Sequence, residues 1–447
     1  MGGMKKTSRN RSKPQTIKEL DRSLSSTTTT QLPSSRSAAR MAIYNFLTSV
    51  NAPLPATEFV LPDEYVEEGK ENEKGLTPEE AIAKFEQLLT PYEKKEILHY
   101  ARVYFVGPKA EKIDGMDKVE TNAGYDDDNG FYKIEEGDHI AYRYEVKDIR
   151  GKGSFGTVVR AYDHKTDKFV AIKIVRNEEK FHRLAEGEIR ILETLRQQDS
   201  NGECNIVHMI DNFTFRNHTC MTFELLSSNL YEILRRNSHQ GLSMELVRKY
   251  SRSILQCLDL LSANKLIHFD LKPENICLKQ NGRSELKVID FGASCYEDQQ
   301  SYTYIQSRHY RAPEVILRSN KYGTPIDMWS FGCVVAELII GYPLLAGEDE
   351  HDQMALMIEL LGMPPPRVTK HAKSKDAFIS SNGHPRYCTV VTKPNGSVSL
   401  SAGRSKRGYT RGTPGSKTWS QVLRKKSTSH LDVSHHLYMA TNTSLTF

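Results

Sequence analysis

Apolar and polar residues alternate along much of the stretch between residues 144 and 175, which is the spacing of β-strands. Further along, apolar residues recur every three or four positions over residues 181–195 and 246–261, as in amphipathic helices. Residues 327–340 are strongly apolar and also favour a helix. The pattern therefore predicts strands in the first part of this region and helices in the second.

Two helix starts precede these strands. Thr77 is a predicted N-cap, followed by a proline and two acidic residues in the first turn, where the helix dipole favours negative charge. Thr90 begins a second pattern of this kind, with proline next and Glu93 after it. Residues 100–106 are rich in aromatic and branched residues, which favour a short strand. We therefore expect a folded accessory domain over residues 76–143.

The N-terminal arm, residues 1–75, is basic and rich in Ser and Thr, with few apolar clusters. Such a composition cannot offset the entropy lost on ordering, so we expect most of this arm to be disordered. Residues 39–50 are the exception, because apolar side chains recur there at the spacing of a transient or docking helix.

Composition and charge narrow the class of protein. A chain of 447 residues can hold a two-lobed domain with an extension, and its mean hydropathy of −0.54 places a good part outside a core. The formal net charge of +5 is small for this length and gives no reason to infer a nucleic-acid partner. Basic runs at residues 5–13 and 404–411 are typical of solvated tails, with a nuclear-import or phosphate-contacting arm as the alternative.

Cysteine usage and hydropathy indicate the compartment. The seven cysteines never form a CxxC pair, and their odd number leaves no complete disulfide framework, which fits a reducing environment. No apolar run reaches the length of a membrane span, and the N-terminus lacks an apolar signal core. Lys6 stands where a myristoylation signal would have Ser or Thr. We expect a soluble cytoplasmic or nuclear protein that does not bind membranes.

A glycine-rich segment lies between the first two predicted strands. Its residues are Gly151, Lys152, Gly153, Ser154, Phe155, Gly156, Thr157 and Val158. Glycines in a strand–turn–strand let backbone N–H groups approach the phosphates of ATP without interference from side chains. The pattern alone would also fit a plain hairpin turn. Because Ala171 and Lys173 follow in the sequence Val-Ala-Ile-Lys, the phosphate role is favoured, and a dinucleotide fold is excluded because a strand follows the glycines.

Two further segments complete a predicted nucleotide site. Glu188, on the helix over residues 181–195, is the expected ion-pair partner of Lys173, whereas Glu186 points off that helix face. Residues 221–226 are predicted to form a buried strand that enters a linker between two lobes, whose backbone would bind adenine. Phe223 would limit the depth of the pocket, although a plain core aromatic is compatible with the same sequence.

The segment around residues 268–275 carries the chemistry. It runs His-Phe-Asp-Leu-Lys-Pro-Glu-Asn and is followed, fifteen positions after its Asn, by Asp290-Phe291-Gly292. Phosphoryl transfer needs a carboxylate near the attacking hydroxyl, a Lys facing the phosphate, and an Asn and a carboxylate for magnesium. Asp270, Lys272, Asn275 and Asp290 provide this set in that order. We expect Asp327 to hold the loop by hydrogen bonds and to take no part in the chemistry.

An activation segment follows over residues 302–314, with the sequence Tyr-Thr-Tyr-Ile-Gln-Ser-Arg-His-Tyr-Arg-Ala-Pro-Glu. A phosphate on one of its tyrosines would add a dianion. Arg308 and Arg311 could pair with that phosphate and order the segment.

From residue 144 to about residue 419 the chain resembles a CMGC-group protein kinase, and it is most similar to the second class of dual-specificity tyrosine-regulated (DYRK) kinases. Residues 89–93 and 104–107 resemble the accessory region of that class, and residues 125–130 with 138–144 resemble the DYRK homology box. The resemblance implies an α+β bilobal fold, with a β-rich N-lobe and hinge over residues 144–226 and a mainly helical C-lobe over residues 227–419.

The resemblance also implies an activity: autophosphorylation of Tyr304, then phosphorylation of Ser and Thr in proteins, at arginine- and proline-directed sites. ATP and Mg²⁺ would be required, and we expect a monomer. By this resemblance, Lys173 and Glu188 form the ion pair, Asp270 is the base, and Asn275 and Asp290 bind magnesium. The residues expected around ATP are Gly151, Lys152, Gly153, Ser154, Phe155, Gly156, Val158, Ala171, Lys173, Phe223, Glu224, Leu225 and Leu226, the last three being the hinge.

The chain departs from that family at three places. Phe269 stands where most kinases have Arg and this family usually has Cys, which threatens packing more than mechanism. His309 replaces a usual Phe. After residue 419 no apolar helical pairs are evident, so residues 420–447 are expected to form an atypical tail, the C-lobe to be incomplete, and Glu314 to lack the Arg that usually pairs with it. The alternative function is therefore a catalytically impaired scaffold or decoy.

Overall fold

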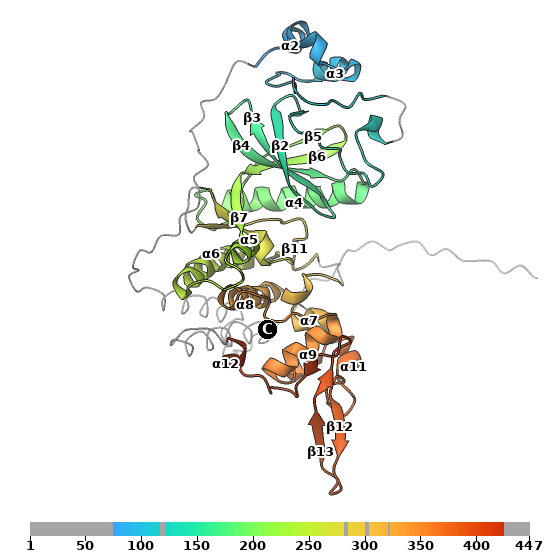
Figure 1. The fold of residues 1–447 in the computed structure, drawn as a ribbon, viewed down its shortest axis with the longest axis vertical. Coiled ribbons are helices and arrows are strands. Elements are labelled where there is room, and N and C mark those ends of the chain that lie inside the picture. Colours follow the sequence, from blue (N-terminus) through green and yellow to red (C-terminus); the bar gives the residue numbers. More distant parts are fainter. Residues whose placement is uncertain (1–74, 117–120, 281–284, 300–303, 321, 424–447) are drawn as a thin grey trace, which may run out of the picture.

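The computed structural model describes residues 75–116, 121–280, 285–299, 304–320 and 322–423. A part built on a β-sheet lies at one end of the molecule and a mainly helical part at the other (Figure 1). This division confirms the predicted bilobal α+β fold. The predicted helix over residues 39–50 lies outside the described residues, as does Tyr302.

The N-lobe is a six-stranded antiparallel sheet in the order β1-β2-β3-β4-β6-β5. Its strands are β1 (His139–Ile140), β2 (Tyr144–Lys152), β3 (Gly156–Asp163), β4 (Lys168–Val175), β5 (Met209–Phe215) and β6 (His218–Glu224). Alternate residues of β3 are buried, which confirms the predicted strand pattern. Helix α4 (Glu179–Gln198) buries the face that carries Phe181, Leu192 and Leu195.

Both predicted helix starts of the accessory region are confirmed. Helices α2 (Pro78–Phe85) and α3 (Pro91–Glu96) begin with complete capping boxes, at Thr77 with Glu80 and at Thr90 with Glu93. Short 3₁₀ turns follow in this region: η1 (Glu86–Leu88), η2 (Ile97–His99) and η3 (Asn122–Gly124).

The predicted strand over residues 100–106 was wrong. Only Val103 pairs there, in an isolated bridge to Leu76. The amides of Tyr104 and Phe105 both donate to the Tyr142 carbonyl, at 2.8 and 3.1 Å. The segment therefore binds the turn between β1 and β2 and does not form a strand of the sheet.

A buried ionic network joins the accessory region to the sheet. Glu93 is 1% exposed and receives Lys112 Nζ at 2.7 Å and His139 Nε2 at 2.9 Å. Arg216, in the turn between β5 and β6, binds Glu96 at 3.0 Å. Although burial opposes ionisation, His139 and Lys112 lower the pKa of Glu93 to about 2. The carboxylate is therefore fully ionised and paired.

The C-lobe is mainly helical, as predicted. Its helices are α5 (Leu230–Arg236), α6 (Met244–Ala263), α7 (Pro313–Ile316), α8 (Pro325–Ile340), α9 (Glu350–Leu361), α10 (Pro366–Thr369), α11 (Lys375–Phe378) and α12 (Trp419–Val422), with 3₁₀ turns η4 (Pro273–Asn275) and η5 (Arg308–Tyr310). Short strands β7 (Leu226–Asn229), β9 (Ile276–Lys279) and β10 (Leu286–Val288) form one sheet, and β8 (Leu266–Ile267) pairs with β11 (Cys295–Tyr296). No helix in the described ranges is long and apolar enough to cross a membrane.

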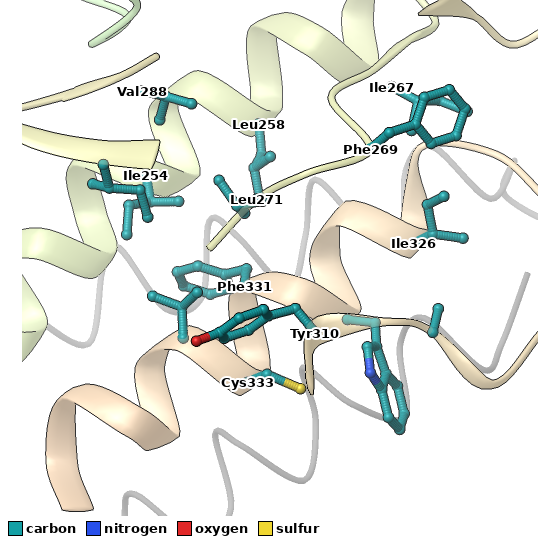
Figure 2. Packing of buried hydrophobic residues seen from close by; sticks show 14 of the residues in the cluster. Ile254, Leu258, Ile267, Phe269, Leu271, Val288, Tyr310, Ile326, Phe331 and Cys333 are labelled. Atoms are coloured by element: carbon teal, nitrogen blue, oxygen red, sulfur yellow. The ribbon is translucent and has the colours of Figure 1, made fainter. Parts of the chain in front are cut away.

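The C-lobe core surrounds the segment that was predicted to carry the chemistry. Figure 2 shows Leu258 of α6, Leu271 of the loop and Phe331 of α8 among the packed side chains. Phe269 is 1% exposed, and its ring meets Tyr322 edge-on with centroids 6.0 Å apart. The core therefore accommodates the unusual Phe269 as a packed side chain.

The last described residues correct one expectation. Helix α12 places Trp419 and Leu423 against α8, and Leu423 is 1% exposed. The packed C-lobe therefore extends to Leu423, beyond its predicted end at residue 419. The rest of the expected tail, residues 424–447, lies outside the described residues. Between α11 and α12 lie the hairpin β12 (Thr389–Thr392) and β13 (Val398–Ser401), and the pair β14 (Gly403–Arg404) and β15 (Thr410–Arg411).

Candidate active site

The glycine-rich segment forms the turn between β2 and β3. The Gly153 amide donates to the Gly156 carbonyl at 2.9 Å, which closes the turn. A Cβ on Gly156 would lie 2.1 Å from the Ile174 carbonyl oxygen, so this glycine is required by packing. At Gly151 and Gly153 a Cβ would meet no heavy atom of the described chain within 4 Å. Internal packing within the described residues therefore does not require these two glycines.

Strand register brings the predicted nucleotide-site residues to one face of the sheet. Val158 lies opposite Lys173 in the β3–β4 pair, and Ala171 lies opposite Phe223 in the β4–β6 pair. Directly opposed residues and residues two apart share a face. Val158, Ala171, Lys173 and Phe223 therefore line the same surface.

Lys173 is the centre of an ionic cluster. Its Nζ lies 2.8 Å from Glu188 Oε1 and 3.0 Å from Asp290 Oδ1, which joins β4, α4 and the segment after β10. Although burial opposes the charge, Glu188 and Asp290 raise the pKa of Lys173, and Lys173 in turn lowers the pKa of Asp290. Glu186 instead points to solvent with a side chain 66% exposed, 3.9 Å from Arg190. The helix face thus separates the two glutamates as expected.

Asp270, Lys272 and Asn275 come together in the loop before β9. Lys272 Nζ lies 2.6 Å from Asp270 Oδ2, and Asn275 Nδ2 donates to the Asp270 carbonyl at 2.9 Å. Asn275 belongs to the 3₁₀ turn η4, which starts at Pro273. The structure therefore places a carboxylate, an ammonium and an amide within one hydrogen-bonded group.

Asp327 holds this loop by hydrogen bonds, as the sequence predicted. Its two carboxylate oxygens accept the amides of His268 at 2.7 Å and Phe269 at 3.1 Å. Phe269 has a φ of 68°, a left-handed backbone that is costly for a bulky side chain. Burial raises the pKa of Asp327 to about 6. The two amide hydrogen bonds hold the strained loop in place, which confirms the expected positioning role.

Sequence reasoning missed Ser307. Its Oγ donates to Asp270 Oδ1 at 2.7 Å, and Lys272 Nζ lies 3.4 Å from the same Oγ. Ser307 is 37 positions from Asp270, so no local spacing connects them. The only signal in the sequence was its place in the activation segment, three residues after Tyr304.

The hinge is held by a cross-lobe ion pair that the sequence also did not indicate. Lys287 of β10 is 3% exposed, and its Nζ lies 3.0 Å from Glu224 Oε1. The same Nζ donates to the Ile206 carbonyl at 2.9 Å. Glu224 ends β6, and Leu226 begins β7 of the C-lobe. The backbone of Glu224, Leu225 and Leu226 therefore joins the two lobes.

The described part of the activation segment places Tyr304 beside Arg311. Tyr304 is 67% exposed, and the Arg311 guanidinium lies 4.0 Å from its ring centroid. Arg311 lowers the pKa of Tyr304 and also binds Glu350 at 2.8 Å. Arg308 instead donates to the Glu348 carbonyl at 2.7 Å. Only Arg311 is thus already in contact with the tyrosine.

The structure also shows the surroundings of Glu314 and His309, two positions of this segment that the sequence analysis singled out. Glu314 Oε2 is buried and has no hydrogen-bond partner within the described part of the chain. Burial raises the pKa of Glu314 to about 7. His309 is half-buried next to Tyr310, and burial lowers the pKa of His309.

A protein kinase domain family matches residues 144–383, the range that holds every group described above. The chain belongs to the protein kinase family. It is 61% identical over 350 residues to the dual specificity tyrosine-phosphorylation-regulated kinase mbk-2 of Caenorhabditis briggsae. It is 58% identical over 349 residues to human dual specificity tyrosine-phosphorylation-regulated kinase 3. The human kinase 4 of the same name is 47% identical over 363 residues. These matches confirm the predicted membership of the DYRK family.

Coverage differs between this kinase and its relatives. The matches to mbk-2 and to human kinase 3 each take in 78% of this chain, but only 43% and 59% of the relatives. For human kinase 4 the shares are 81% and 66%. Much of these relatives therefore lies beyond the region compared.

Proposed function

We propose that this chain is an ATP-dependent protein kinase that autophosphorylates Tyr304 and phosphorylates Ser and Thr residues of other proteins. The observation that carries the proposal is the position of Lys173 Nζ, 2.8 Å from Glu188 and 3.0 Å from Asp290. A Lys held between a helix and the DFG segment is the arrangement that an active kinase needs for the phosphates of ATP.

The residues present fit ATP and a divalent metal. The open space above Gly151 and Gly153 suits phosphates, and the face with Val158, Ala171 and Phe223 suits an adenine ring. Asn275 and Asp290 offer the oxygen ligands that Mg²⁺ prefers. When bound, Mg²⁺ would neutralise charge that develops on the transferred phosphoryl group.

Asp270 is the proposed base. Its Oδ1 accepts from the Ser307 hydroxyl at 2.7 Å, which is the geometry that an acceptor hydroxyl of a substrate would need. Lys272 Nζ lies 2.6 Å from Oδ2, and with ATP bound it would face the phosphoryl oxygens. A substrate hydroxyl would therefore share Asp270 with Ser307 or displace it.

Tyr304 is the proposed autophosphorylation site. A phosphate on its exposed hydroxyl would gain charge-assisted hydrogen bonds from Arg311, which already contacts the ring. Arg308 would have to leave the Glu348 carbonyl to join it. For other proteins, the prediction remains that Ser and Thr are phosphorylated at arginine- or proline-directed sites. The partners that we propose are these protein substrates.

A non-catalytic scaffold is the second candidate. Glu314 Oε2, which has no partner among the described residues, favours it, because an unsatisfied buried polar atom costs stability. That cost falls on the C-lobe and leaves the ionic cluster around Lys173 intact, so we prefer the kinase.

The decisive experiment compares the full chain with its Asp270→Asn variant, both produced in bacteria. Mass spectrometry should find phosphate on Tyr304 in the wild type alone, and substrate phosphorylation should fall at least ~100-fold in the variant. ATP should raise the melting temperature of both proteins, because Asp270→Asn leaves the nucleotide site in place. Folded wild type that binds ATP but carries no phosphate would instead support the scaffold.

A further inference from the structure

The β12–β13 hairpin projects from the C-lobe, away from the rest of the molecule (Figure 1). Its turn is closed by the Lys393 amide, which donates to the Ser397 carbonyl at 2.8 Å. An isolated two-stranded hairpin is marginally stable in water. The side chains on its exposed faces therefore indicate what could cover and stabilise it.

The register of the hairpin separates its side chains into two different faces. Val390 lies opposite Leu400 and Thr392 opposite Val398, so these four residues share one face. The other face carries Thr389, Val391, Ser399 and Ser401. One face is thus largely aliphatic and the other largely hydroxylated. The aliphatic face is exposed, with Val390 48% and Val398 51% accessible.

The base of the hairpin is fixed to the C-lobe. A Cβ on Gly403 would lie 1.7 Å from the Tyr387 carbonyl oxygen, so the two chain segments are in close backbone contact. Tyr387 Oη donates to the Gly412 carbonyl at 2.8 Å. Arg411 binds Asp352 of α9 through Nε at 2.6 Å and Nη2 at 2.8 Å. The exposed aliphatic face therefore belongs to a hairpin that is held at its base.

Both outer edges of the hairpin are open. In the described part of the chain, β12 and β13 form a sheet of two strands and no third strand pairs with either. An open edge offers N–H and C=O groups to an added strand.

The charge around the hairpin is of one sign. Residues 377–419 contain no Asp or Glu and seven basic residues: Arg386, Lys393, Arg404, Lys406, Arg407, Arg411 and Lys417. Lys406, Arg411 and Lys417 pair with acids of the loop before α9 and of α9 itself. The remaining four are exposed, and the Arg407 amide donates to the Glu348 carboxylate at 3.1 Å. Within the described residues no ion pair is formed by the side chains of Arg386, Lys393 and Arg404. An incoming segment therefore meets Lys393 and Arg404, whose side chains form no ion pair within the described residues.

We propose that the β12–β13 hairpin is a docking site for an extended acidic segment of a partner protein, which adds as a strand at an open edge. Aliphatic side chains of the segment would cover Val390, Val398 and Leu400, and its carboxylates would meet Lys393 and Arg404. A second copy of the hairpin would bring like charges together. Nucleic acid is disfavoured because the exposed face is aliphatic, whereas single strands stack on aromatic rings.

The test uses the full-length Asp270→Asn protein, so that its result does not depend on phosphoryl transfer. The probe is a fluorescein-labelled peptide of alternating Val and Glu, and anisotropy measures its Kd. Val390→Thr together with Val398→Thr should weaken binding at least about fivefold, because each change replaces a methyl group of the aliphatic face with a hydroxyl group. Val391→Thr, on the opposite face and 43% exposed, is the matched control and should change Kd less than about twofold.

Charge provides an independent arm. Lys393→Gln with Arg404→Gln should weaken binding of the acidic peptide at least about fivefold, and 0.5 M salt should remove most of that difference. A peptide of alternating Val and Lys should not bind. Hydrogen exchange of the Val391 and Ser399 amides checks that every variant keeps the hairpin.

Several results would overturn the proposal. Absence of saturable binding of the Val/Glu peptide is one, and equal weakening by Val391→Thr is another. Tighter binding of a twelve-nucleotide single strand, insensitive to the valine changes, would assign the surface to nucleic acid. Concentration-dependent dimerisation that Val390→Thr abolishes would assign it to a second copy of this chain.

Discussion

Glu93 in the accessory region is a buried glutamate and Glu314 in the C-lobe is a half-buried one with a buried Oε2, yet their surroundings are opposite. Glu93 is held by Lys112 at 2.7 Å and His139 at 2.9 Å, and its pKa is lowered to about 2. Glu314 has a buried oxygen without a partner in the described ranges, and burial raises its pKa to about 7. Burial alone therefore does not set the charge of an acid; the partners that are buried with it do.

This difference gives the two carboxyl groups opposite contributions to stability as the pH changes. The pKa of Glu93 is lower in the folded protein than in the unfolded chain, so its stabilisation is present above about pH 4.5 and is lost as the pH falls toward 2. The pKa of Glu314 is higher in the folded protein. Its contribution therefore favours folding below about pH 4.5 and is lost as the pH rises from 4.5 through about 7.

The largest effect is expected from Glu93→Gln. The change leaves Lys112 Nζ, whose side chain is 9% exposed, without its carboxylate and should lower the free energy of unfolding by about 3 kcal/mol. Urea denaturation at pH 7 measures the free energy of unfolding of the variant and the wild type. Glu86→Gln is the matched control, because Glu86 is 71% exposed and pairs with Lys94 only at 3.5 Å. Equal losses in the two variants would contradict the role of the buried network.

An effect of opposite sign and smaller size is expected from Glu314→Gln. At pH 8 the wild type carries the cost of an ionised carboxylate whose Oε2 has no partner among the described residues, so the variant should gain about 2 kcal/mol of unfolding free energy. At pH 4.5 the gain should disappear, because the acid is then protonated. Thermal melts across this range check the prediction. Burial also raises the pKa of Glu337 to about 7 and the pKa of Asp327 to about 6, so these groups titrate in the same pH range. The quantity to compare is therefore the difference in stability between variant and wild type at each pH. A gain independent of pH would argue against ionisation of Glu314.

The smallest effect is expected on helix α4, where two glutamates lie two positions apart. Glu186→Gln should change the unfolding free energy by less than about 0.5 kcal/mol, since Glu186 lies 3.9 Å from Arg190 on the exposed surface. Phosphorylation of a peptide substrate should be unchanged within about twofold. Glu188→Gln, beside it in the same assay, should lower that activity strongly, because it removes the partner of Lys173. Similar activities would sink the assignment of Glu188.

Much of the fold followed from patterns within a few residues. The capping boxes at Thr77 and Thr90 join positions three apart, so the sequence alone located both helix starts. Alternation in β3 and helical spacing in α4 were equally local. The same argument failed over residues 100–106, where aromatic and branched residues favoured a strand but the amides of Tyr104 and Phe105 bind the Tyr142 carbonyl. Composition could not reveal that competing partner.

The candidate site divides in the same way. Asp270, Lys272 and Asn275 lie within six residues, and their order was enough to predict a group of this kind. The link from Ser307 to Asp270 spans 37 positions, and the link from His139 to Glu93 spans 46. Neither could be foreseen from spacing, because the chain must fold before such residues meet.

The sequence by itself determined the kinase family, the strands β2 to β4 and the long helices α4, α6 and α8 of the two lobes, and the identity of the groups around the proposed reaction. Only the tertiary structure decided that Ser307 contacts the proposed base, that Glu93 is buried with Lys112 and His139, and that the hairpin presents an exposed aliphatic face. The physical reason is range. Hydrogen bonds inside a turn depend on neighbours in sequence, whereas burial and charge pairing depend on which distant segments the fold packs together.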